Sequence, residues 1–158
     1  MNIPRNVVVI GIGNQLRGDD GAGLEAARRV RDCELSTSIT VHLHEGDAVG
    51  LLSLWDKADA ALLIDAVRSG APPGTIHRLD ASHAPLPSPV RQASSHTLGI
   101  AEAIELARAL GTLPPTIRVY GIEGGRFEAG AELTIRIASA LDTLVRELRV
   151  EALRLSAA

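Results

Sequence analysis

The sequence contains very little cysteine and very few aromatic residues. Cys33 is the one cysteine among 158 residues, which excludes an intramolecular disulfide and any cysteine-rich zinc or iron–sulfur site. Aromatic residues make up 2% of the chain, so a base-stacking platform for single-stranded nucleic acid is not expected. The hydrophobic core must therefore be built from alanine and the branched aliphatic side chains.

The sequence also lacks a surplus of basic residues and a long apolar run. Its formal net charge of -3 offers no excess of positive charge for nucleic acid or an anionic membrane surface. No apolar run approaches the roughly 20 residues that span a bilayer, and the N-terminal segment does not resemble a secretion signal. We therefore expect residues 1–158 to form one soluble, cytoplasmic domain without nucleic-acid or membrane partners. The sequence does not indicate an oligomeric state.

Strand-like and helix-like segments alternate along the chain. Continuous or alternating apolar runs predict strands at 7–10, 39–43, 60–64, 75–79 and 116–122. Helical spacing predicts helices at 21–31, 48–55 and 95–110, and a last helix whose apolar stripe runs from Ile137 to Leu148. Such alternation predicts a three-layer α/β/α sandwich with a five-stranded, mostly parallel sheet. The run 75–79 follows its predecessor too closely for a helical crossover, so we predict a hairpin-like antiparallel edge strand.

A glycine-rich loop with two consecutive carboxylates follows the first predicted strand. It spans Gly11 to Gly21 and contains Asp19 and Asp20. The dinucleotide fingerprint G-x-G-x-x-G fails here because Leu16 stands where the third glycine is required. An aspartate near a helix N-terminus often caps it, but two exceed what capping needs. We therefore expect one aspartate to cap the helix and the other to face the binding cleft.

Three further polar residues are predicted at the same edge of the sheet, where ligands bind in folds of this kind. Asp65 ends a buried strand, either as a functional carboxylate or as a turn aspartate that bonds its own backbone. His96 begins a helix that must start where the parallel strands end. Glu123 directly follows the last predicted strand. It could be a ligand, a partner that positions a ligand, part of a substrate groove or an ordinary loop residue. The pair His42 and His44 is expected to be a surface feature.

Asp20, Asp65 and His96 together form a candidate site with two possible chemistries. Carboxylates and an imidazole suit divalent first-row metals, including nickel, and three protein ligands leave positions open for substrate or water. The same three residues could carry out general acid–base catalysis without metal. The chain has no Gly-x-Ser-x-Gly motif, and Cys33 is not expected at this edge, so covalent catalysis is not predicted.

Five segments, in order and at compatible spacing, resemble one known family. They are Gly11-Ile-Gly-Asn-Gln-Leu-Arg-Gly-Asp-Asp-Gly-Ala-Gly23, Leu-Ile-Asp65-Ala-Val, Ser-Ser-His96-Thr-Leu-Gly-Ile-Ala-Glu-Ala, Gly-Ile-Glu123-Gly and Gly130-Ala-Glu-Leu. From about Val7 to about Leu144 the chain resembles the hydrogenase maturation proteases, peptidase family M52, whereas the helical tail 145–158 lies outside the resemblance. The resemblance implies a twisted five-stranded sheet with helices on both faces. It also implies an endopeptidase, aspartic-type or nickel-dependent, that removes the C-terminal extension of a [NiFe] hydrogenase large-subunit precursor after nickel insertion.

The resemblance also implies the site residues. An acidic residue in the glycine-rich loop, an aspartate after a central strand and a histidine that opens a later helix contact metal in the family. By motif position these are Asp20, Asp65 and His96, and the family has either Glu or Asp at the first. Our hypothesis is that nickel arrives in the precursor, and that nickel or a carboxylate activates the attacking water. The alternatives are a resident-metal peptidase or amidase and a non-catalytic metallocofactor chaperone. A phosphate or nucleotide binder is disfavoured because the carboxylates would repel phosphate.

Overall fold

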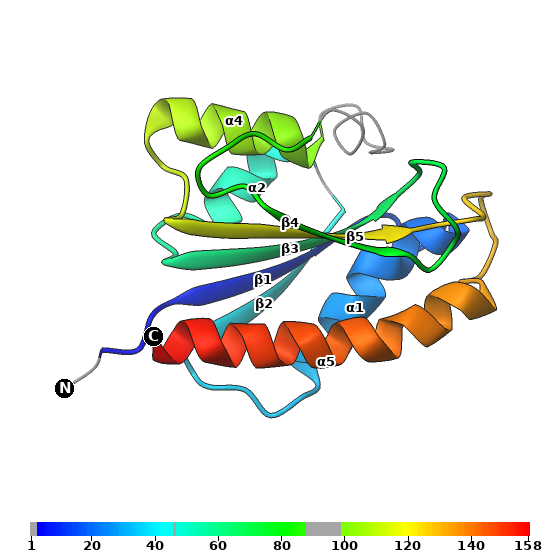
Figure 1. Ribbon diagram of the computed structural model, residues 1–158, viewed down its shortest axis with the longest axis horizontal. Coiled ribbons are helices and arrows are strands. Elements are labelled where there is room, and N and C mark those ends of the chain that lie inside the picture. The colour runs from blue at the N-terminus through cyan, green and yellow to red at the C-terminus, as the bar shows by residue number, and fades with distance from the viewer. Residues whose placement is uncertain (1–2, 46, 88–98) are drawn as a thin grey trace.

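A mixed sheet of five strands lies between two layers of helices (Figure 1). The computed structural model describes residues 3–45, 47–87 and 99–158. The strands are β1 (Val7–Ile12), β2 (Ile39–His44), β3 (Ala60–Val67), β4 (Ile76–Asp80) and β5 (Thr116–Glu123). Their order across the sheet is β2-β1-β3-β5-β4, with β4 as the antiparallel edge strand. The α/β/α fold predicted from the sequence is confirmed.

The edge strand β4 has a different partner from the one predicted. It is antiparallel and at the edge, as expected, but it pairs with β5 rather than with β3, so the hairpin prediction is wrong. The connection from β3 to β4 passes over the end of β5: the Gly74 N–H donates to the Glu123 carbonyl oxygen at 2.7 Å. Residues 68–75 are long enough to step across one strand, because neighbouring strands lie only about 4.8 Å apart.

The helices cover both faces of the sheet. Helices α1 (Ala22–Arg31) and α5 (Ile135–Ala157) lie on one face, and α2 (Ala48–Leu54) and α4 (Ile100–Leu110) lie on the other (Figure 1). Alternate residues of β3 enter the two cores: Leu62 packs on the α1–α5 side and Leu63 on the α2–α4 side. A strand buried on both faces has no polar side, which explains the continuous apolar runs in the sequence.

Helix α4 begins later than the periodicity predicts. Gly99 precedes it with an extended backbone, so the helix starts at Ile100 and does not run continuously from Ser95. Its end agrees with the prediction, since Gly111 follows it in the left-handed conformation at φ 72°. Figure 1 shows α4 beginning over the carboxyl ends of the parallel strands.

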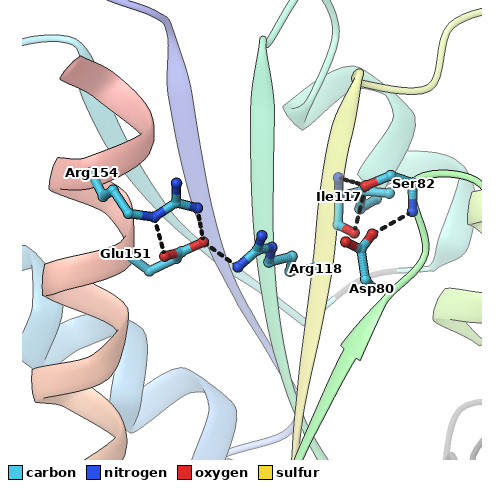
Figure 2. Close-up of polar contacts among 6 residues, drawn as sticks. All are labelled: Asp80, Ser82, Ile117, Arg118, Glu151 and Arg154. Carbon is cyan, nitrogen blue, oxygen red and sulfur yellow. Dashed lines mark hydrogen bonds and ion pairs between the residues drawn. The ribbon is translucent and has the colours of Figure 1, made fainter. Parts of the chain in front are cut away.

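The long helix α5 is held across the sheet by a buried stripe and by ion pairs. Figure 2 shows Glu151 of α5 between Arg118 of β5 and Arg154, with which it forms ion pairs. Nearer the middle of the helix, Glu147 pairs with Arg78 of β4 at 2.6 Å. These contacts help to set the orientation of α5 across the sheet. The N-terminal end of α5 consequently lies beside the carboxyl ends of the strands (Figure 1). No helix among the described residues is long and apolar enough to cross a membrane.

Candidate active site

Glycines press the loop that carries Asp20 onto the ends of β1 and β3. A Cβ atom on Gly23 would lie 2.4 Å from the Ile64 carbonyl oxygen and 2.5 Å from that of Ile12, so only glycine allows α1 to begin so close to the strands. A Cβ on Gly13 would lie 2.0 Å from the Asp20 carbonyl oxygen. The glycines of this segment therefore pack the loop against the sheet. Asp20 follows in the short 3₁₀ turn η1 (Gly18–Gly21), which contacts β3.

Asp20 and Asp65 are two buried carboxyl groups that lie close together. Their exposed fractions are 1% and 2%. Asp65 is near the end of β3, on the face of the sheet that α4 covers, because it alternates in step with Ala61 and Leu63. Burial raises the pKa of Asp65 well above its usual range, the negative charge of Asp20 raises it further, and a hydrogen bond from the Ala66 backbone only partly opposes this. Paired acids with perturbed pKa values are typical of functional sites.

The raised pKa of Asp65 gives a prediction about stability. The folded chain holds this proton more tightly than the unfolded chain, so the stability it contributes is fully present below the unfolded pKa of about 3.9. That stability is lost as the pH rises through the folded pKa. Asp65→Asn removes the ionisation and keeps the shape. We therefore expect the variant to melt higher than the wild type at about pH 8, by about 3 °C or more, and by a smaller margin at about pH 5, where the wild type has lost less of this stability. Differential scanning calorimetry at both pH values measures this, and a variant that melts lower than the wild type at pH 8 would contradict it.

Asp19 has neither of the roles predicted for the two aspartates. It is completely buried, and no side-chain capping bond is present at the start of α1. Its carboxylate instead accepts hydrogen bonds from the backbone N–H groups of Gly125 (2.8 Å), Arg126 (2.9 Å) and Thr134 (2.8 Å). The Thr134 hydroxyl donates a fourth, at 3.2 Å. Asp19 thus joins the loop of Asp20 to the segment between β5 and α5.

Glu123 holds the loop that follows β3. Its buried carboxylate accepts hydrogen bonds from the Ser69 N–H (2.6 Å) and hydroxyl (2.7 Å) and from the Gly70 N–H (3.0 Å). The His77 ring lies 3.1 Å away as a fourth partner. Burial by itself would raise the pKa of Glu123, but these hydrogen bonds outweigh it and hold the pKa below its usual value. Glu123 therefore holds the loop after β3 in place, a role that was not predicted from the sequence.

The remaining histidines and the cysteine fall in different places. His96 lies outside the described residues. His77 was not among the predicted site residues, although strand alternation places it on the same face as Leu79 and thus beside Glu123. The His44 ring lies 2.8 Å from the Asp47 carbonyl oxygen, which occupies one of its nitrogens. Cys33 follows the end of α1 that is remote from Asp20. Among the residues that the structure describes, no group of three or more His, Cys, Asp or Glu side chains is placed to hold a metal.

Comparison with known proteins identifies the family. The HycI model, described as hydrogenase maturation protease, matches residues 43–151. The chain belongs to the hydrogenase maturation protease family. It is 30% identical to the hydrogenase expression/formation protein HupD of Rhodobacter capsulatus over 92% of this chain and 72% of that protein. It is 33% identical to HupD of Thiocapsa roseopersicina over 74% of this chain, and spans about half (53%) of that relative's length.

The fold of this chain is shared with solved structures of the family. The [NiFe] hydrogenase maturation protease HybD from Thermococcus kodakarensis superposes with a TM-score of 0.72, at 24% identity, over 93% of this chain and 99% of that one. At this level of identity the likeness establishes the fold. The part of the chain that the family model matches contains the positions of Asp65 and His96, and Asp20 precedes it.

Proposed function

We propose that this chain is the endopeptidase that removes the C-terminal extension of a [NiFe] hydrogenase large-subunit precursor. The nickel is carried by the precursor, and Asp20, Asp65 and His96 contact it. The observation that carries the proposal is the buried pair Asp20 and Asp65 at the carboxyl edge of the sheet, in a chain of the maturation protease family. A pair of buried acids lowers stability, so its presence calls for a functional explanation.

The start of α4 supports a place for His96 near the two acids. Helix α4 begins over the carboxyl ends of the strands (Figure 1), and Asp65 is on the face of the sheet that α4 covers. His96 precedes Gly99 by three residues in the sequence. Three residues span at most about 11 Å, and this short separation from the start of α4 supports the proposed contact of His96 with the site.

The raised pKa of Asp65 explains how nickel would be recognised. Burial and the charge of Asp20 both raise the pKa of Asp65, so without a cation this carboxyl group tends to keep its proton. A divalent cation beside both carboxylates favours the ionised form of each and releases that proton. The site therefore favours the nickel-loaded precursor over the nickel-free one. With the loaded precursor bound, the carboxylates are placed to accept a proton from the attacking water.

Replacing His96 tests the three-residue site. We expect His96→Ala to abolish processing of a nickel-loaded precursor, because the site loses its one imidazole, while the circular dichroism spectrum and melting temperature stay at wild-type values. The readout is the mass of the precursor's C-terminus after incubation. His83→Ala is the matched control, since His83 is exposed in the loop after β4, and it should process normally. Normal processing by His96→Ala would remove His96 from the site.

A further inference from the structure

We propose that a pocket next to Asp19 binds the C-terminal extension of the precursor through an apolar side chain and a carboxylate of that extension. The pocket, called here the Ile135 pocket, has a volume of about 380 Å³ and is lined by Pro73, Gly125, Arg126, Thr134, Ile135 and Arg136. The proposal rests on the proposed function, which supplies the substrate, and adds the surface that selects it.

The Ile135 pocket lies directly beside the loop of the candidate active site. Three of its lining residues, Gly125, Arg126 and Thr134, donate their backbone N–H groups to the Asp19 carboxylate. Asp19 is the immediate neighbour of Asp20 in the turn η1. A peptide that passes Asp20 can therefore reach this pocket within a few residues.

The walls of the pocket are fixed by contacts within the protein. Asp19 binds the backbone of Arg126, after β5, and of Thr134, at the start of α5. Glu123 binds Ser69 and Gly70 in the loop that leads to Pro73. The loops are packed closely, since a Cβ on Gly125 would lie 3.1 Å from Pro73 Cγ. Two buried carboxylates thus maintain the shape of a surface pocket, and a preformed pocket loses little entropy when a ligand binds.

The pocket is lined by an exposed apolar side chain and by two arginines. Ile135 is 85% exposed at the first position of α5, and the surface that lines the pocket is mostly apolar. Arg126 and Arg136 also line the pocket and are exposed, and neither guanidinium forms an ion pair or hydrogen bond with another residue of the described ranges. In a chain of net charge -3, this is a local positive surface. It is complementary to a segment that places an apolar side chain near a carboxylate.

The extension fits this surface better than the mature part of the precursor does. A C-terminal extension ends in a free carboxylate and can enter an open pocket as a chain end. The mature part is bound to the metal and has to fold around it. We therefore assign the Ile135 pocket to the segment that leaves after cleavage.

The test combines peptide binding with processing kinetics. The probe is a fluorescent synthetic peptide with the sequence of the extension of the precursor used, titrated with the full-length protein by anisotropy. We expect Ile135→Ser and the double variant Arg126→Ala/Arg136→Ala each to weaken peptide binding by about tenfold or more. The same variants should raise KM for the nickel-loaded precursor and leave kcat unchanged. Val150→Ser is the matched control, because Val150 is also an exposed apolar residue of α5 and lies toward the other end of that helix.

The outcomes separate this proposal from the proposed function. Wild-type affinity and wild-type KM in the pocket variants would overturn the pocket assignment while processing by the wild type stands. Tighter binding of a peptide that ends at the cleavage site, on the mature side, would overturn it as well. If the wild-type protein binds the extension peptide through these residues but leaves the loaded precursor uncut, the pocket assignment holds and the proposed function fails.

Discussion

Asp20→Asn is expected to stop removal of the C-terminal extension while the protein stays folded. The substitution keeps the shape of a buried side chain, on a loop that glycines allow to pack against the sheet, and it removes a negative charge of the site. With one carboxylate fewer, the site binds a cation less tightly, and one group that can accept a proton from water is lost. We expect the processing rate to fall about a thousandfold or more. The rate is followed by the mass of the precursor's C-terminus over time.

Two further variants show whether the charge of Asp20 is responsible. Asp20→Glu should retain measurable processing, because it restores the carboxylate one methylene farther out. Asp32→Asn should process at the wild-type rate, since Asp32 is exposed beyond the far end of α1. If Asp20→Asn processes the precursor at a rate within tenfold of the wild-type rate, Asp20 takes no part in the chemistry. In that case the buried pair would have to be explained as a purely structural feature.

Asp19→Ala should cause the largest loss of stability of any single substitution considered. The carboxylate accepts three backbone N–H groups and one hydroxyl, and it has no exposed surface. Each buried donor left without an acceptor costs about 1–3 kcal/mol, so we expect the free energy of unfolding to fall by about 3–5 kcal/mol. That is a large share of the about 5–15 kcal/mol by which domains are stable. Urea denaturation measures the change.

The control for Asp19 is an aspartate in a surface ion pair. Asp142→Ala removes a carboxylate whose side chain is 75% exposed and which pairs with Arg29 at 3.2 Å, so the expected change is within about 1 kcal/mol. A loss of similar size for Asp19→Ala would mean that water replaces the carboxylate at these N–H groups. The joining of the loops by Asp19 would then have little energetic weight, and the Ile135 pocket would lose one of its supports.

Local patterns in the sequence were enough to predict the layers and the place of the site. The continuous apolar runs before Gly11 and Asp65 predicted strands buried on both faces, and parallel strands bring their carboxyl ends to one edge. That geometry predicted that Asp20 and Asp65 meet, as the structure shows. His96 stays a prediction, because it lies outside the described residues.

Contacts between distant segments could not be predicted in the same way. The partners of Asp19 are 106 to 115 residues away along the chain, and nothing near Asp19 in the sequence signals them. The pairing of β4 failed for a related reason. Its closeness to β3 in the sequence suggested a hairpin, whereas β5, more than 30 residues later, occupies the position between them. Once β5 is known to be the neighbour of β4, the alternation of residues along β4 does predict that His77 lies beside Glu123.

The proposed function requires that the protein cut a precursor whose nickel it recognises through Asp20, Asp65 and His96. The most direct measurement incubates the wild-type protein with nickel-loaded and with nickel-free large-subunit precursor, and compares the C-terminal mass of each. We expect the loaded precursor to lose its extension and the nickel-free precursor to keep it. Equal cleavage of both would contradict nickel recognition and leave a protease that acts without it. An uncut loaded precursor that nevertheless binds would contradict the protease and indicate a metallocofactor chaperone.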